Sequence, residues 1–251
     1  MSSLFRNYQN QSLKLAMEEG LLIESNVHEI LSLSSILLIS PNSHSPLMID
    51  LFGSALLEQI HEEFVPTQKI ELDPELESKF REAIKKANKV SRDHGIDWLS
   101  AEILNNRNLK NFGSVILKGL ETLPIDKIEI SETSLITNHL DYIMKGIFHN
   151  PDKHIVQWPN TALNKSKSRT NKPDFVVSVI HQLQMVADIS IGEVSPPSQK
   201  TNVYKNCNDL IQLSIFLKDC MDCAIDNGAE INVIGFQCIG KEINMKCFFH
   251  L

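Results

Sequence analysis

The spacing of apolar residues changes after Pro124, and this change most limits the folds open to the chain. Before that proline, apolar residues recur mostly at steps of three and four, which predicts amphipathic helices. After it, short valine-rich runs alternate with helical stretches, which predicts strands mixed with helices. We therefore expect an α/β (α+β) protein with a helical N-terminal part, residues 1–125, and a mixed second domain, residues 126–251.

Prolines mark two helix starts in the N-terminal part. Pro46 is expected to open a helix whose apolar stripe continues to Phe64, and Asp73 supplies a capping side chain before Pro74 in the first turn of the next helix. An earlier helix is expected over residues 26–41. No residue pattern in this half indicates catalysis, so we interpret it as scaffold.

The second part predicts the order helix, strand, strand, strand, helix, strand. The expected elements are a helix capped by Ser131, strands over 155–158, 175–180 and 186–194, a long amphipathic helix over 204–225, and a strand over 231–239. The polar segment 164–172 is predicted to be a mobile loop that trypsin cuts first. The chain ends soon after the last strand, which leaves open a truncated C-terminus for this domain.

Three acidic residues lie at informative places in this order. Asp174 follows Pro173 at the start of one predicted strand, Glu193 lies near the end of the next strand, and Glu132 stands in the first turn of the preceding helix. Carboxylates on neighbouring strands can point into one volume, where they repel each other unless a divalent cation lies between them. Asp174 and Glu193 are therefore candidate ligands for Mg²⁺ or Mn²⁺, the kind of ion that supports phosphodiester cleavage.

Four short motifs accompany these acids along the predicted order of elements. They are Trp158-Pro159-Asn160-Thr161, Lys172-Pro173-Asp174, Gly192 to Pro196, and Lys218-Asp219. With these motifs, residues from about 130 to 240 resemble the PD-(D/E)xK superfamily of nucleases, and within it a large, lineage-expanded group of fungal proteins. The resemblance implies a restriction-endonuclease-like αβββαβ core around a small central mixed sheet.

The resemblance also implies roles for individual residues. Asp174 and Glu193 would hold the metal ion, Glu132 would support the site from its helix, and the Val194 carbonyl group would complete it. The superfamily normally has a lysine two residues after the second acid, where this chain has Ser195. Loss of one such charge-stabilising group costs about 10² to 10³ in rate.

A lysine from elsewhere in the chain could supply the missing charge. Lys205, near the start of the following helix, is the first candidate, and Lys200 is the second. A basic run just before Asp174 provides candidate phosphate-binding residues, and it also fits a nuclear import signal or a solvated loop. These residues are Lys165, Lys167, Arg169 and Lys172. The net charge of -7 argues against phosphate binding over the whole surface but is compatible with a local basic groove.

Cysteine usage and hydropathy indicate an intracellular protein, cytoplasmic or nuclear, without a membrane span. The 5 cysteines form an odd number, and the first residues lack a secretory pattern. The longest apolar stretch, residues 31–39, contains serines and is too short to cross a bilayer. Cys220 and Cys223 lie within the long predicted helix, which accounts for both.

The leading hypothesis from sequence is a divalent-metal-dependent nuclease-like protein, with weakened or degenerate activity, that acts on DNA phosphodiesters. The alternative is a catalytically inactive descendant of that fold that binds nucleic acid or protein. A third possibility is an interaction protein in which the helical half binds the partner. Acids clustered at one place favour the first hypothesis, and a salt-bridged Asp174 would favour the others.

Overall fold

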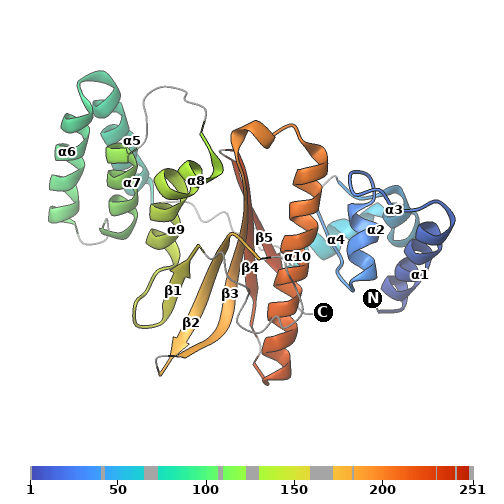
Figure 1. Cartoon of the computed structure of the whole chain (residues 1–251). Coiled ribbons are helices and arrows are strands. Elements are labelled where there is room, and N and C mark those ends of the chain that lie inside the picture. Colours follow the sequence, from blue (N-terminus) through green and yellow to red (C-terminus); the bar gives the residue numbers. More distant parts are fainter. Residues whose placement is uncertain are drawn as a thin grey trace. The chain divides into compact units, whose positions relative to one another are not determined.

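The computed structural model describes residues 2–40, 43–64, 73–106, 110–122, 130–158, 172–182, 184–229, 231–240 and 242–248. The protein is of the mixed α/β class with a helical N-terminal part and a mixed sheet, as predicted, and the sheet has five strands (Figure 1). The chain forms two compact units, one of residues 1–67 and 157–251 and one of residues 68–156. This division differs from the predicted one at residue 125, because the first helices belong with the sheet.

The first unit begins with helices whose ends differ from the sequence prediction. These are α1 (Ser2–Glu18), α2 (Val27–Leu33), α3 (Pro46–Phe52) and α4 (Ser54–Phe64). The helix expected over 26–41 ends at Leu33, and Ser35 just beyond it has φ 60°. The helix expected from Pro46 to Phe64 is divided at Gly53, which has φ 75°. A left-handed residue cannot continue a right-handed helix, so the single-helix prediction was wrong at both places.

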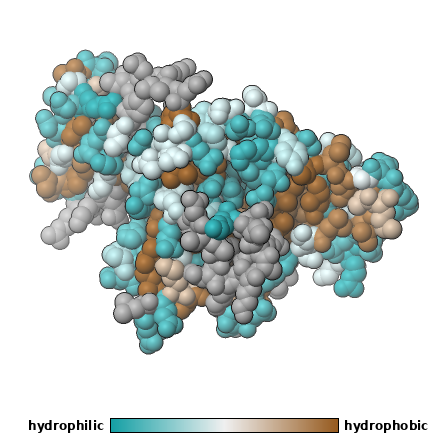
Figure 2. All heavy atoms as spheres, viewed as in Figure 1, coloured by the Kyte–Doolittle hydropathy of each residue, from teal (hydrophilic) through white to brown (hydrophobic). Residues whose placement is uncertain are grey.

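Apolar side chains bind these helices into the first unit. Tyr8, Met48, Phe52 and Leu57 form one buried cluster within the helical segment. A second cluster joins α2 to the long helix α10 (Val203–Asp226) through Leu31 and Ile211. Figure 2 shows that hydrophobic residues also gather at the surface over α1–α4. Leu13 and Met17 on α1 are among the exposed apolar side chains of this unit.

The sheet has the strand order β1-β2-β3-β4-β5, and the boundary between the two units falls within β1 (His154–Gln157). β2 (Phe175–His181) pairs antiparallel with β3 (Gln184–Ser195), and β3 pairs parallel with β4 (Val233–Ile239). The helix α10 makes the crossover between β3 and β4, as a parallel pair requires. The order of elements along the chain matches the prediction, and β5 (Glu242–Phe248) follows β4 and pairs antiparallel with it.

The two faces of the sheet have different neighbours. Helix α10 packs against β3 and β4 (Figure 1), where a Cβ atom on Gly235 would lie 2.5 Å from Leu217 Cδ1. On the opposite face, a Cβ atom on Gly192 would lie 2.3 Å from the ring of Phe236. Since side chains alternate along a strand, Glu193 and Ser195 lie on the α10 face of β3.

The second unit is helical. It contains α5 (Pro74–Lys89), α6 (Arg92–Asn105), α7 (Lys110–Thr122), α8 (Glu132–Leu135), a π-helical turn (Ile136–Leu140) and α9 (Asp141–Phe148). The caps predicted at Asp73 and Ser131 are confirmed, whereas Asn26, expected to begin the earlier helix, makes no side-chain capping bond to α2. The Glu75 N–H donates to Asp73 Oδ1 at 2.9 Å, and the Ser134 N–H donates to Ser131 Oγ at 3.2 Å. Within the described residues, no helix is both long and apolar enough to cross a membrane.

Candidate functional site

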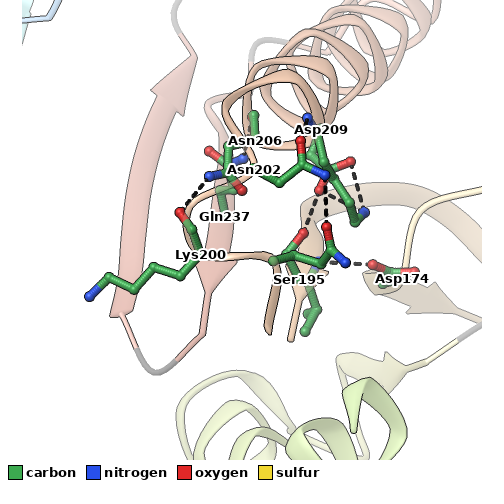
Figure 3. Close-up of polar contacts among 10 residues, drawn as sticks. Asp174, Ser195, Lys200, Asn202, Asn206, Asp209 and Gln237 are labelled. Carbon is green, nitrogen blue, oxygen red and sulfur yellow. Dashed lines mark hydrogen bonds and ion pairs between the residues drawn. The ribbon is translucent and has the colours of Figure 1, made fainter. Parts of the chain in front are cut away.

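Asp174 lies beside the end of β3 because of the strand register. It directly precedes β2, whose first residue Phe175 is opposite Gly192, so Asp174 is brought next to Glu193. Its carboxylate is held by the backbone of β3, since Asp174 Oδ2 accepts a hydrogen bond from the Val194 N–H at 2.8 Å (Figure 3). The structure thus brings together the two acids that were predicted to meet from neighbouring strands.

Glu193 is a buried carboxyl group beside Asp174. The residue is 6% exposed, and the strand register brings Asp174 next to it. Burial, then the negative charges of Asp174 and Asp209, raise the pKa of Glu193 to about 9, although the Lys205 charge lowers it. Burial also raises the pKa of Asp174, while the Val194 N–H opposes that shift. At neutral pH the pair therefore holds a proton.

One oxygen of this pair has no hydrogen-bond donor. Glu193 Oε1 is buried and lacks a hydrogen-bond partner among the described residues. Buried carboxyl oxygens are almost always paired, so this oxygen is a place where an ion or a water molecule can bind.

Ser195 connects the sheet to α10. It is the last residue of β3 and is completely buried, and its Oγ donates a hydrogen bond to Asp209 Oδ2 at 2.7 Å. Asp209 lies on α10 and is 5% exposed. The first turn of α10 is fixed by Asn202, whose Oδ1 accepts the Lys205 N–H at 3.0 Å. Strand end and helix start are therefore joined by polar side chains (Figure 3).

The structure distinguishes the two lysine candidates. Lys205 Nζ lies 3.0 Å from Asp209 Oδ2 and 3.2 Å from Asp209 Oδ1, and its charge lowers the pKa values of both Glu193 and Asp174. Lys200 instead donates through Nζ to Glu242 Oε1 at 2.5 Å, on the exposed surface. Figure 3 shows its side chain extending away from Ser195 and Asp174. Lys205 therefore belongs to the acid cluster, and Lys200 does not.

A layer of amide side chains lies next to the acids. Gln237 on β4 is opposite Glu193 in the parallel register, and its Nε2 donates to the Asn206 backbone oxygen at 2.7 Å. Asn206 Nδ2 donates to the Lys200 backbone oxygen at 3.0 Å. Asn206 Oδ1 is also buried without a hydrogen-bond partner in the described part of the chain.

The other predicted site residues are not among the described contacts of this cluster. Glu132 is the first residue of α8 in the second unit, so the cluster described above is built from the first unit alone. Lys165, Lys167 and Arg169, with most of the segment 164–172 predicted to be mobile, lie outside the described residues. Lys172 is described and exposed, two residues before Asp174. Lys218, from the fourth motif, pairs with Asp222 on α10.

Asp209 and Gln237 were not identified from the sequence. The signal for Asp209 was available, because Lys205 and Asp209 are four residues apart and such pairs meet on a helix. Asp209 also interrupts the apolar stripe of α10, where a buried polar residue indicates a specific partner. Gln237 had no comparable local signal, because its neighbours come from other elements.

The residues present suit a hard divalent cation in one respect. The acid pair offers carboxyl oxygens, which Mg²⁺ and Mn²⁺ prefer, and the unpaired Glu193 Oε1 could receive such an ion. No group of three or more His, Cys, Asp or Glu side chains suited to a metal ion occurs among the described residues. Asp209 already accepts from Ser195 and Lys205, so two carboxyl groups remain as protein ligands.

No family model, no curated protein and no solved structure matches this chain. The likeness to a nuclease superfamily therefore depends on the short motifs and on the order of elements.

Proposed function

We propose that the protein is a divalent-metal-dependent nuclease-like protein that acts on DNA phosphodiesters at the Asp174–Glu193 pair. The observation that carries the proposal is the strand register that brings these two acids to neighbouring positions, with one buried oxygen of Glu193 left without a donor. Two neighbouring carboxylates are unfavourable unless a proton or a cation compensates them. The pair is therefore prepared to exchange its proton for Mg²⁺ or Mn²⁺.

Each residue of the cluster has a role in this proposal. Asp174 and Glu193 would hold the ion, and a bound Mg²⁺ or Mn²⁺ supplies polarisation of the phosphate and a more acidic water. The Val194 N–H keeps the Asp174 carboxylate in place. The Lys205 ammonium would stabilise negative charge on the phosphate, the task of the lysine that Ser195 replaces. Its side chain is 35% exposed, so it can approach a substrate from the surface.

The arrangement of the strands supports the superfamily resemblance. Asp174 directly precedes β2, Glu193 lies near the end of the antiparallel β3, and α10 leads from β3 to the parallel β4. These are the places that the PD-(D/E)xK resemblance assigns to its two acids. DNA is the proposed substrate because of that resemblance and the basic residues that precede Asp174.

The direct test measures Mn²⁺ binding by calorimetry and metal-dependent nicking of supercoiled plasmid. We expect the wild-type protein to bind Mn²⁺ and to nick, and Asp174→Asn and Glu193→Gln to lose Mn²⁺ binding. Lys205→Ala should keep Mn²⁺ but nick about 10² to 10³ times more slowly. Lys218→Ala, on the same helix, is the control and should behave like the wild type. A wild-type protein that neither binds Mn²⁺ nor nicks DNA would refute the proposal.

A second candidate function is a catalytically inactive descendant that binds nucleic acid or protein. Two observations favour it: Ser195 occupies the place of the usual lysine, and the Lys205 ammonium is already paired with Asp209. The two candidates differ in one measurement. A wild-type protein that binds labelled duplex DNA in fluorescence anisotropy but does not nick plasmid with Mn²⁺ would support the inactive descendant.

A further inference from the structure

We infer that Asp209 is a positioning residue that holds the Lys205 ammonium at the Asp174–Glu193 pair. The inference rests on the proposed function for the catalytic role of Lys205. Whether Asp209 holds the Lys205 ammonium can be measured without catalysis. Asp209 would thereby let α10 supply the positive charge that β3 lacks at Ser195.

The contacts of Asp209 fix it from two sides. Its Oδ2 accepts from the buried hydroxyl group of Ser195 at 2.7 Å, which ties it to the end of β3. Both of its carboxylate oxygens contact Lys205 Nζ, at 3.0 and 3.2 Å. Lysine has a flexible four-carbon stem and its ammonium has no preferred direction, so it needs a fixed acceptor to be held at one place. An acceptor tied to the strand that carries Glu193 meets this need.

The charges of Asp209 and Lys205 act on the acid pair. The Lys205 charge lowers the pKa values of Asp174 and Glu193, and the Asp209 charge raises both. The ammonium is thus within electrostatic reach of the two proposed ligands while it is paired with Asp209. Asp209 is a third carboxylate near Asp174 and Glu193, and its charge repels theirs. Holding the Lys205 ammonium gives this carboxylate a role that offsets the repulsion.

A second lysine–aspartate pair on α10 offers a matched comparison. Lys218 and Asp222 have the same spacing of four residues and also form an ion pair. The Asp222 side chain is 52% exposed, whereas that of Asp209 is 7% exposed and bonded to the strand. Exposed pairs of this spacing hold their partners weakly. A difference in lysine acetylation rate between the two pairs therefore reports the effect of burial and of the hydrogen bond from Ser195 to Asp209.

The inference also sets an expectation for Ser195→Lys. The Ser195 side chain faces Asp209 and is completely buried. A lysine at this position would bring a second ammonium to Asp209 and would compete with Lys205. The substitution is then expected to give little or no gain in nicking while Lys205 is present, and a larger gain in the Lys205→Ala background.

The first experiment measures the acetylation rate of each lysine by mass spectrometry with limiting acetic anhydride. In the wild type, Lys205 should react slowly because its ammonium is held by a buried carboxylate. We expect Asp209→Asn to raise the Lys205 rate about tenfold, since an opposite charge commonly shifts ionisation by about one pKa unit. Ser195→Ala should raise it less, because the ion pair remains. Asp222→Asn is the control and should change Lys218 alone.

The second experiment separates positioning from metal binding. Asp209→Asn should retain Mn²⁺ binding and should nick more slowly. It should have no further effect in the Lys205→Ala background, because Asp209 acts only through the Lys205 ammonium. Loss of Mn²⁺ binding in Asp209→Asn would make Asp209 a metal ligand and overturn the inference. An unchanged Lys205 acetylation rate in Asp209→Asn would overturn it as well. If no variant nicks DNA, the proposed function fails, and acetylation alone decides the positioning role.

Discussion

At Glu193, burial and neighbouring negative charge act on the carboxyl group in the same direction. They raise its pKa from 4.5 to about 9, so the folded protein binds a proton there that the unfolded chain releases near pH 4.5. The contribution of this proton to the free energy of unfolding is fully present below about pH 4.5 and is lost as the pH rises towards 9. This carboxyl group therefore links folding to pH across the neutral range.

We predict that the metal-free protein loses stability between about pH 5 and 9, with a slope of at most about 1.4 kcal/mol per pH unit from this group. Urea unfolding at several pH values measures the slope. Glu193→Gln should flatten it, because the amide does not titrate, whereas Asp222→Asn should leave it unchanged. A slope that is equal in the wild type and in Glu193→Gln would contradict the buried, protonated state.

Gly192 shows how close the backbone of β3 lies to an aromatic ring. A Cβ atom there would lie 2.3 Å from Phe236 Cε1. The Phe236 ring also contacts the Phe175 ring, and their centroids are 5.0 Å apart. We predict that Gly192→Ala lowers the free energy of unfolding by about 1–3 kcal/mol, the usual cost of overpacking a core. Thermal unfolding measures the loss, and Phe236→Leu in the same chain should recover part of it.

At the scale of the element, the start of α10 determines where Lys205 and Asp209 stand. Asn202 caps this helix through the Lys205 N–H, and Asn202 Nδ2 also donates to Gln199 Oε1 at 2.8 Å. We predict that Asn202→Ala lowers the free energy of unfolding by about 1 kcal/mol, because the N–H loses its acceptor. Asn202→Ser keeps a capping oxygen and should lose less. Equal losses in urea unfolding would show that the cap itself contributes little.

Helix α3 ends where α4 begins because Gly53 adopts φ 75°. The apolar stripe continues across this break, so periodicity alone indicated one helix. Gly53 has ψ 145°, a combination that alanine adopts only at a cost on the order of 1–3 kcal/mol. The break therefore depends on the backbone freedom of this one glycine. The spacing of apolar residues shows which face of a helix is apolar. It does not reveal a break in the helix when the apolar spacing continues across the break.

At the scale of the whole molecule, the first helices fold with the sheet. Leu31 on α2 is 0% exposed and packs in a cluster with Ile211 on α10, whereas Leu33 on the same helix is 42% exposed. Trp158 packs against Phe175 with ring centroids 4.9 Å apart, so its fluorescence reports on the sheet. Leu31 and Trp158 therefore belong to one compact unit.

We predict that Leu31→Ala lowers the stability reported by Trp158 by about 2–5 kcal/mol, in a Trp98→Phe background that leaves Trp158 as the only tryptophan. The core loses a buried side chain, and the sheet should unfold with it. Leu33→Ala is the matched control and should change stability by less than about 0.5 kcal/mol. If Leu31→Ala left the Trp158 transition in place, the division at residue 125 would describe the folding units better.

The sequence by itself determined the class of the fold, the order of the strands and α10, and the caps at Asp73 and Ser131. It also placed Asp174 and Glu193 together. The elements and their caps follow from apolar spacing and capping chemistry, which involve residues close in the chain. The expected meeting of the two acids follows from their places in consecutive strands. Only the tertiary structure decided that Lys205 rather than Lys200 meets the acids, that Asp209 holds it, and that α2 packs with α10. Those contacts depend on how the elements pack in three dimensions. The sequence pattern does not distinguish the residues that make them from other residues of the same type.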